Sequence, residues 1–162
     1  MELTAPNQVY VADITYIRTL QGFCYLALLT DAYSRKIVGY NVSRSLSIEG
    51  SLASLKMAIR QSGNLTGLIH HSDRGVQYCS YEYTKLLKKN NIRISMTEQN
   101  HVYENALAER VNGILKDEFL LGETLQSYQV ARKMARQAID IYNNERPHLS
   151  INYEKPAQRH AA

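Results

Sequence analysis

Two aspartates in strand-like apolar runs constrain the fold of this chain more than any other feature. Asp13 lies inside the run 9–17, and Asp73 follows a short run that begins at Leu68. Val, Ile, Thr and Tyr dominate the first run, which is typical of a β-strand. Its apolar residues point both ways, so both faces of the sheet should be covered. A strand that leads to Asp73 places a carboxylate where open α/β sheets bind ligands.

Each of these carboxylates allows two interpretations. A charged group in a mostly buried strand is costly unless it is paired, solvated in a cleft or bound to a metal ion. Asp13 is therefore either a ligand in a cleft or an aspartate that is hydrogen-bonded to a neighbouring turn. Asp73 lies at the end of a strand, where aspartate is usually a turn or cap residue. The two residues taken alone leave these alternatives open.

The remaining pattern alternates strands and helices along the chain. Gln21-Gly22 predicts a turn between the first two strands, and Asp31 is expected to be a turn residue before the third. Ser47 and Gly63 are expected to start and stop the first helix. The expected strands are 9–17, 23–30, 36–42, 67–72 and 92–96, and the expected helices are about 47–61, 80–90, 106–119 and 128–142.

The helix expected at 106–119 has an apolar stripe and a polar stripe on opposite sides. The core-facing positions are Leu107, Val111, Ile114 and Leu115. The polar stripe, within about two turns, consists of Asn105, Glu109, Asn112 and Lys116. A solvated face is the ordinary explanation of such a stripe. The alternative is a metal ligand, Glu109, beside a phosphate-binding cation, Lys116.

Two segments outside these elements are polar. Residues 97–105 show no periodicity, and they form either a plain connector or a loop that orders over a substrate. The segment after Tyr142 is expected to end in a polar, basic C-terminal tail. Since no repeat or linker divides the chain, residues 1–162 are expected to form one domain.

Charge and apolar content narrow the classes of partner. A net charge of +4 and a pI near 9.0 favour an anionic partner such as nucleic acid. The longest apolar run, 23–29, is too short to span a bilayer, and no secretory leader opens the chain. Cys24 and Cys79 make neither a disulfide framework nor a zinc motif. We therefore expect no membrane partner and a cytoplasmic location.

Several short motifs of this chain occur together in one known family. They are Asp13-Ile14-Thr15-Tyr16, Asp31-Ala32-Tyr33-Ser34-Arg35-Lys36-Ile37-Val38-Gly39, His71-Ser72-Asp73-Arg74-Gly75 with Gln77-Tyr78, Asn105-Ala106-Leu107-Ala108-Glu109, and Tyr142-Asn143 with Arg146-Pro147-His148. The interval of 35 residues between Asp73 and Glu109 belongs to the same pattern. In this order the chain resembles the ribonuclease-H-like catalytic core of DDE transposases and retroviral-type integrases. More closely, it resembles the integrase core of bacterial insertion-sequence transposases.

The resemblance implies a fold and an activity. The fold is a ribonuclease-H-like α/β domain, in which a mixed five-stranded sheet has its first three strands antiparallel and helices on both faces. The strand that leads to Asp73 should lie beside the strand of Asp13. The activity is that of a DDE polynucleotidyl transferase, which frees a 3′-hydroxyl at an element end and joins it to target DNA. Asp13, Asp73 and Glu109 would be its catalytic residues.

The same three carboxylates would be the metal ligands. Hard oxygen ligands suit Mg²⁺ or Mn²⁺, and converging carboxylates can hold two such ions about 3.5–4 Å apart. Without cations their like charges repel, so we expect a site that is only partly organised when no metal is bound. No small-molecule cofactor is implied.

The implied partners are DNA, at the element ends and at the target, and further copies of the chain, since two ends must be joined. Lys116 matches the family's basic residue seven positions after the glutamate, and it would contact DNA. Asn105 and Asn112 would hydrogen-bond DNA or a metal-bound water. Arg74 would touch a phosphate or form a salt bridge beside Asp73. In a bacterial cell the protein would be associated with the nucleoid.

The chain departs from the family pattern in three ways. Tyr10 stands where a tryptophan is usual, and Glu104 stands where an aspartate is usual. The helical DNA-binding region that family members carry at the N-terminus is expected to be absent. Two other functions stay open, namely a catalytically inactive DNA-binding remnant and a ribonuclease-H-like nuclease. The intact carboxylate set argues against the first, and the segment 146–148 argues against the second.

Overall fold

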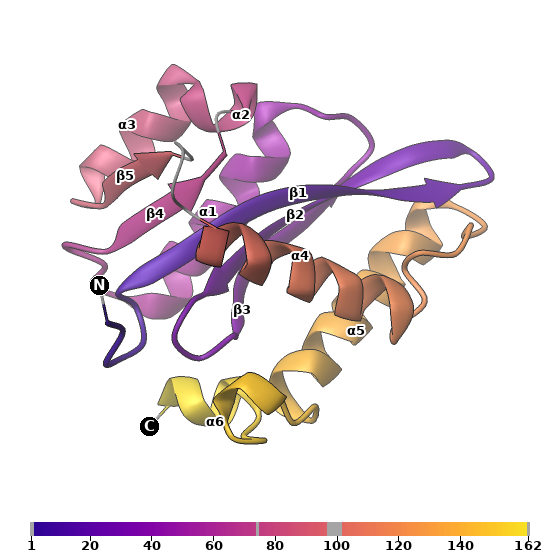
Figure 1. Ribbon diagram of the computed structural model, residues 1–162. Coiled ribbons are helices and arrows are strands. Elements are labelled where there is room, and N and C mark those ends of the chain that lie inside the picture. Colours follow the sequence, from indigo (N-terminus) through magenta and orange to yellow (C-terminus); the bar gives the residue numbers. More distant parts are fainter. Residues whose placement is uncertain (1, 74, 97–101, 162) are drawn as a thin grey trace.

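The computed structural model of this protein describes residues 2–73, 75–96 and 102–161. They form a mixed sheet of five strands in the order β3-β2-β1-β4-β5, with helices on both faces (Figure 1). The strands are β1 (Val9–Thr19), β2 (Gly22–Asp31), β3 (Ile37–Ser43), β4 (Ile69–Ser72) and β5 (Arg93–Met96). The expected ribonuclease-H-like architecture is confirmed.

Strand pairing brings the two aspartates to neighbouring strands. β1 is antiparallel to β2, and β2 is antiparallel to β3. β4 runs parallel to β1 but pairs with it only at Val9, Tyr10 and Val11. Asp13 lies just beyond this paired segment, and Asp73 directly follows β4. The prediction that the strand before Asp73 lies beside the strand of Asp13 is therefore confirmed.

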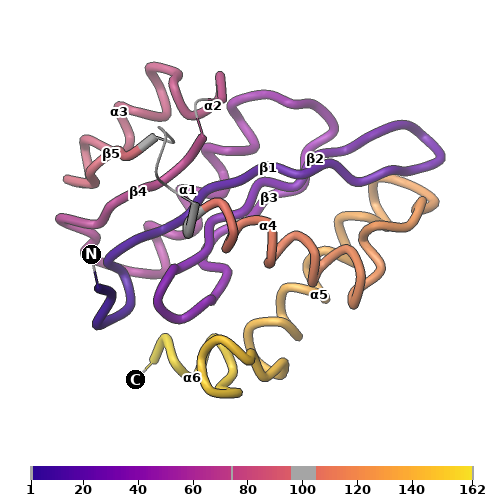
Figure 2. The backbone as a smooth tube through the Cα atoms, viewed as in Figure 1, coloured from indigo at the N-terminus to yellow at the C-terminus, as the bar shows by residue number. Residues whose placement is uncertain are grey.

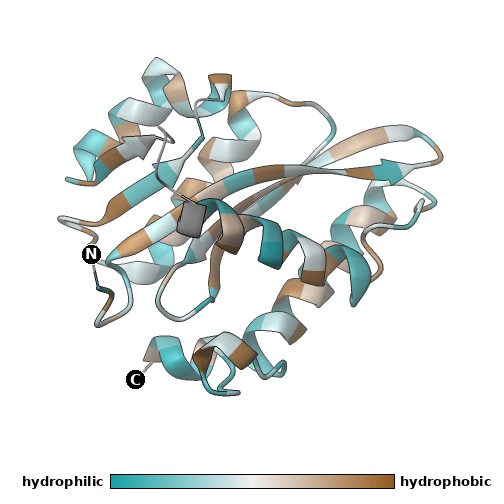
Figure 3. Cartoon of the chain, in the orientation of Figure 1, coloured by the Kyte–Doolittle hydropathy of each residue, from teal (hydrophilic) through white to brown (hydrophobic). Residues whose placement is uncertain are grey.

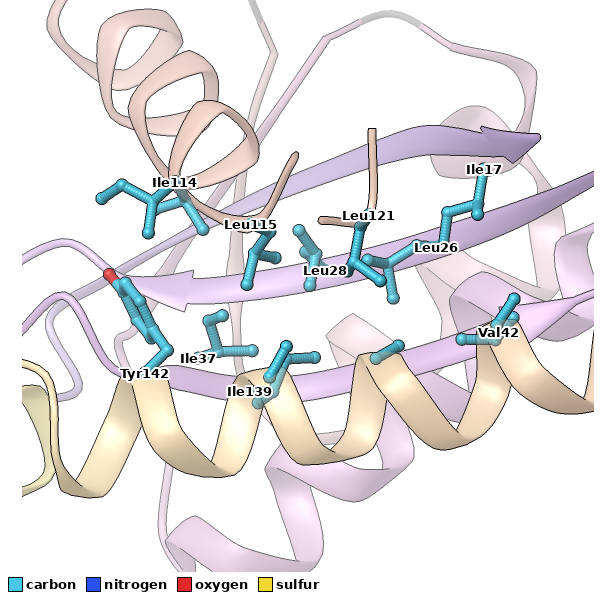
Figure 4. Close-up of a cluster of buried hydrophobic side chains, with 14 of the residues drawn as sticks. Ile17, Leu26, Leu28, Ile37, Val42, Ile114, Leu115, Leu121, Ile139 and Tyr142 are labelled. Atoms are coloured by element: carbon cyan, nitrogen blue, oxygen red, sulfur yellow. The ribbon is translucent and has the colours of Figure 1, made fainter. Parts of the chain in front are cut away.

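Two apolar cores lie on opposite faces of the sheet, because alternate residues of β1 point to opposite sides. Val9 and Val11 pack with α4 (Val102–Asp117) and α5 (Tyr128–Asn144). Tyr10 and Ala12 pack with α1 (Ile48–Ser62) and α3 (Tyr81–Lys89). Figure 4 shows the first core, where Ile114 and Leu115 of α4 and Ile139 and Tyr142 of α5 face Leu26, Leu28, Ile37 and Val42.

The outer surfaces of the helices are more polar than the strands that they cover, as Figure 3 shows. The predicted apolar stripe of α4 is confirmed, since Leu107, Val111, Ile114 and Leu115 are all buried. Among the described residues, no helix combines the length and the apolar character needed to cross a bilayer.

Helix boundaries differ from the sequence expectation in two places. α4 begins at Val102, so residues 102–105 are helical rather than part of the expected loop, while 97–101 lie outside the described residues. Extending an existing helix fixes one residue for each hydrogen bond gained, whereas starting a helix fixes three residues for the first bond. This difference favours the extension. A short helix, α2 (Val76–Cys79), was not expected; it precedes α3, which Ser80 caps as predicted.

The C-terminal segment is folded, although the sequence suggested a polar tail. It forms a 3₁₀ turn, η1 (Leu149–Ile151), and a helix, α6 (Pro156–Ala161). His160 of α6 places Nδ1 2.8 Å from the Ser34 hydroxyl, in the turn between β2 and β3. Polar side chains thus attach this segment to the sheet through contacts that no local pattern reveals.

The motif around Tyr142 and Arg146 holds the end of α5 against the sheet. Asn143 accepts a hydrogen bond from the Ile37 N–H at 2.9 Å and donates one to the Ile37 carbonyl at 3.0 Å. Its amide therefore satisfies the backbone of the edge strand β3 at its first residue. Arg146 forms a bidentate pair with Glu118, with N–O distances of 2.6 and 2.7 Å. These contacts give the motif a structural role at the end of α5.

Acidification is expected to destabilise the fold through His70. Its side chain is buried, its Nε2 lies 2.7 Å from the Tyr83 hydroxyl, and burial lowers its pKa from 6.5 to about 4. The unfolded chain therefore binds a proton between these pH values that the folded chain does not. Stability present above pH 6.5 is lost as the pH falls toward 4, by about 1.4 kcal/mol per pH unit.

Urea unfolding across this pH range checks the effect. His70→Leu should give a shallower decline of unfolding free energy than the parent, whatever its absolute stability. Equal slopes for the two proteins would show that His70 does not contribute.

Candidate active site

Asp13 is the most enclosed of the predicted catalytic carboxylates. It lies on β1 in a segment beyond the pairing with β4, and α4 packs against this strand. Asn112 of α4 donates a hydrogen bond from its side-chain amide to Asp13 Oδ2. Burial raises the pKa of Asp13, and the negative charge of Asp73 adds to the rise. The Asn112 amide, the Ile14 backbone N–H and the Lys116 charge act in the opposite direction.

Asp73 lies at the carboxyl end of β4, as predicted, and its side chain is exposed. Its Oδ1 accepts a hydrogen bond from the Gly75 N–H at 2.9 Å. A Cβ atom at position 75 would itself lie 2.9 Å from that oxygen, so a larger residue here would require the Asp73 carboxylate to move. Asp73 is therefore a turn residue, as one of the two interpretations predicted. The hydrogen bond to Gly75 uses its Oδ1 and not its Oδ2.

A pocket of about 250 Å³ joins the two aspartates. Asp13 and Asp73 both contribute to its lining, although they are 60 positions apart in the chain. The remaining lining residues are Ile14, Thr15, Tyr16, Tyr25, Leu46, Gly75, Gln77 and Tyr78. The structure therefore brings together two of the three predicted carboxylates at the sheet end where ligands of such folds bind.

Glu109 is not part of this pocket. It is exposed on α4, one turn before Asn112 on the same face, and it lines a separate surface hollow with Asp117 and Glu118. In the described part of the chain, no three His, Cys, Asp or Glu side chains lie close enough together to hold a metal ion. The expected three-carboxylate cluster is therefore not assembled in this arrangement, in keeping with the repulsion between like charges.

The predicted DNA-contacting residues divide into three groups. Asn112 and Lys116 face the site. Asn112 donates a hydrogen bond to Asp13, and the positive charge of Lys116 lowers the pKa of Asp13. Asn105 is exposed near the start of α4, on the same face as Glu109. Arg74 lies outside the described residues.

The donor set at this site fits a hard divalent cation. Two aspartates that face one pocket supply the carboxylate oxygens that Mg²⁺ and Mn²⁺ prefer. Asn112 Oδ1 is buried and has no hydrogen-bond partner among the described residues. A buried amide oxygen without a partner is costly, and a water of a hydrated cation would satisfy it.

Sequence reasoning missed the aromatic wall of the pocket. Tyr16 and Tyr25 are directly opposed across the β1–β2 hairpin, and both line the pocket. The predicted turn at Gln21-Gly22 fixes the register of the hairpin, so it could have been used to predict that Tyr16 and Tyr25 lie opposite one another. Tyr78 is buried beside the same aspartates, and burial raises its pKa well above the ordinary value.

A mixed five-stranded sheet with two carboxylates at adjoining strands defines a ribonuclease-H-like domain. The chain belongs to the integrase core domain family: one family model described as an integrase core domain matches residues 4–101, and a second with the same description matches 90–156. Transposase and integrase cores of this kind are polynucleotidyl transferases.

Curated relatives of the chain come from bacterial insertion sequences. The insertion element IS600 uncharacterized 31 kDa protein of Shigella sonnei is 39% identical over 155 residues, which cover 95% of this chain and 57% of that protein. Transposase InsF for insertion sequence IS3A of Escherichia coli is 36% identical over 156 residues, which cover 96% of this chain and 54% of that protein. The chain thus spans little more than half the length of these relatives.

Solved structures confirm the fold. The HTLV-2 integrase catalytic core domain, determined in complex with magnesium in a trimeric form, superposes with a TM-score of 0.76 at 18% sequence identity. The match covers 98% of this chain and 99% of that domain. The ribonuclease-H-like architecture is therefore shared along almost the whole length of both chains.

Proposed function

We propose that this chain is the catalytic core of an insertion-sequence transposase, which performs metal-dependent 3′-end cleavage of DNA followed by strand transfer. The observation that carries this proposal is the single pocket shared by Asp13 and Asp73, with Asn112 bound to Asp13. The family membership and the transposase name of the E. coli relative point to the same chemistry.

Asp13, Asp73 and Glu109 are the proposed catalytic residues and metal ligands, with Mg²⁺ or Mn²⁺ as a pair of ions. When bound, these ions neutralise the charge that develops on the attacking and leaving oxygens of a phosphodiester. Magnesium in the HTLV-2 integrase core supports this choice of cation. Glu109 lies one turn from Asn112 on the same face of α4, so a rotamer change can direct its carboxylate toward the site.

The other polar residues have positioning roles in this proposal. Asn112 fixes the orientation of Asp13 through a hydrogen bond from its amide to Oδ2. Lys116 offers a positive charge to a DNA phosphate beside the carboxylates. Asn105 lies farther along the same helix face, where it can hydrogen-bond the DNA backbone, and Arg74 is proposed to contact a phosphate.

The proposed partners are the element ends, the target DNA and further copies of this chain. The chain is basic, which favours a polyanion. The trimeric form of the HTLV-2 integrase core supports an oligomer. A cytoplasmic, nucleoid-associated location follows from action on bacterial DNA.

A cleavage and strand-transfer assay tests the proposal. The substrates are duplexes that carry the inverted repeats bordering this chain's own coding sequence, and a plasmid target. With Mg²⁺ or Mn²⁺ we expect a nick at the 3′ end and covalent joining to the plasmid, and neither product in chelator. Cleavage of an RNA–DNA hybrid without joining would instead identify a ribonuclease-H-like nuclease. DNA binding without any metal-dependent product would identify an inactive remnant.

A further inference from the structure

The β1–β2 hairpin exposes aromatic side chains beside the two aspartates. Tyr16 is 48% exposed and Phe23 is 56% exposed. Their ring centroids are 5.3 Å apart in an edge-to-face arrangement. Tyr25 lies opposite Tyr16 across the hairpin, and Leu46 is exposed next to the same pocket. A contiguous apolar patch of this kind usually marks a contact surface.

The patch is continuous with the proposed catalytic pocket. Tyr16 and Tyr25 line that pocket together with Asp13 and Asp73. Lys116 extends from α4 and places its Nζ 4.8 Å from the centroid of the Tyr16 ring. The positive charge of the same lysine also lowers the pKa of Asp13. Lys116 therefore lies close to both the Tyr16 ring and the Asp13 carboxylate.

The backbone that carries these rings is held at both ends. β4 pairs with β1 at Val9–Val11, and Leu125 occupies the same edge again through reciprocal hydrogen bonds of 2.9 Å with Arg18 and Leu20. Figure 2 shows the hairpin projecting past β4 and β5. The aromatic surface therefore belongs to a fixed part of the sheet, so little entropy is lost in ordering the protein when a ligand binds there.

We infer that Tyr16, with Phe23 and Tyr25 beside it, is a stacking platform for a DNA base displaced from the duplex next to the cleaved phosphate. This inference rests on the proposed function, because it takes the scissile phosphate to lie at Asp13 and Asp73. Tyr16 is three residues from Asp13 along β1, which separates their Cα atoms by about 10 Å. That separation corresponds to about three nucleotides along one strand of a duplex. Alternate residues of a strand point to opposite faces, but Tyr16 and Asp13 line the same pocket.

The chemistry of the patch favours an unpaired base over a protein partner. An aromatic face next to a basic side chain is the combination that binds single-stranded nucleic acid, because rings stack on bases and cations bind phosphates. Arg18 is exposed on the same hairpin and adds to the positive charge. A second copy of this chain seated on the patch would also cover the pocket that holds Asp13 and Asp73.

Fluorescence of 2-aminopurine tests this inference, because stacking on an aromatic ring quenches it. The probe is a short duplex with an unpaired end, which carries 2-aminopurine at one of the three positions beside the cleavage site in separate substrates. The variants are Tyr16→Leu, which keeps an apolar side chain without a ring, and Tyr16→Phe, which keeps the ring. Tyr81→Ala is the matched control, since Tyr81 is an exposed tyrosine on α3 with the Lys85 ammonium 5.7 Å from its ring centroid.

The parent, Tyr16→Phe and Tyr81→Ala proteins should quench the probe at one of the three positions. Tyr16→Leu should lose this quenching and bind the unpaired end about tenfold more weakly, while its affinity for a fully paired duplex changes little. Equal quenching by the parent and Tyr16→Leu would overturn the inference. So would a shift of Tyr16→Leu from dimer to monomer in sedimentation with unchanged quenching, because the patch would then be a protein interface.

The assay also separates this inference from the proposed function. Quenching that depends on Tyr16, in a chain that neither cleaves nor joins DNA with any divalent cation, would support the platform and refute the catalytic proposal. Metal-dependent cleavage by the parent, together with equal quenching by the parent and Tyr16→Leu, would support the catalytic proposal and refute the platform.

Discussion

Replacement of Glu109 by glutamine is expected to reduce metal-dependent DNA cleavage at least about a hundredfold, to the level of the background. Loss of a residue that only supports a metal ligand typically costs 10–100-fold, so loss of a direct carboxylate ligand should cost at least as much. A neutral amide of the same size is a poor ligand for a hard dication. The exposed position of Glu109 predicts a change in unfolding free energy within about 0.5 kcal/mol.

Three measurements on the same preparation test this prediction. Cleavage with Mg²⁺ should be lost, DNA affinity in chelator should persist, and the rise in melting temperature on addition of Mg²⁺ should shrink, because a ligand stabilises only in proportion to its affinity. Glu123→Gln is the matched control, since Glu123 is an exposed glutamate outside the site. A variant that cleaves as well as the parent would show that Glu109 is not a ligand, and the third carboxylate would have to come from elsewhere.

Replacement of Asp31 by alanine is expected to cost about 3–5 kcal/mol of folding stability, the largest effect of any single substitution considered for this fold. Asp31 is fully buried at the end of β2. Its carboxylate accepts hydrogen bonds from the backbone N–H groups of Asn7, Tyr33 and Ser34 at 2.7, 2.9 and 2.8 Å. Alanine leaves these donors without their partner, and each bond to a charged acceptor contributes about 1.5–3 kcal/mol. Part of this loss is offset, because the desolvation cost of the buried charge is removed as well.

Thermal and urea unfolding measure the effect, with melting expected about 10 °C or more below the parent. Asp31→Asn should lose about half as much, because the amide keeps one acceptor oxygen while its NH₂ group faces the remaining donor. Glu123→Ala, at an exposed carboxylate, should lie within about 0.5 kcal/mol of the parent. An Asp31→Ala protein as stable as the parent would show that water replaces the carboxylate in this turn.

The Asp31 contacts give this motif a structural role outside the pocket of Asp13 and Asp73. The sequence predicted Asp31 to be a turn residue, and the turn between β2 and β3 is built on its Oδ1. His160 Nδ1 of α6 lies 3.8 Å from Asp31 Oδ2, so the C-terminal helix contacts the same carboxylate. Asp31 is therefore a buried junction of three segments, namely the N-terminal segment at Asn7, the β2–β3 turn and α6.

Sequence patterns were sufficient for the order of the five strands and the four longer helices, the two-sided burial of β1 and the apolar face of α4. These features depend on near neighbours, because a period of two or of 3.6 residues is visible in any short window. The sequence also predicted that Asp13 and Asp73 lie on adjoining strands, since the family pattern carries the strand order with it. The boundary of α4 at Val102 was missed because residues 97–105 show no such period.

The tertiary structure alone decided which polar groups meet. Asn112 reaches Asp13 across 99 positions of the chain, Asn143 reaches Ile37 across 106, and His160 reaches Ser34 across 126. It also decided that Glu109 lines a separate hollow, while Tyr16 and Tyr25, which were given no site role from the sequence, line the pocket of the two aspartates. Such pairings depend on how whole helices pack against the sheet. Periodicity specifies which face of a helix is buried, but it carries no information on which distant side chain that face will meet.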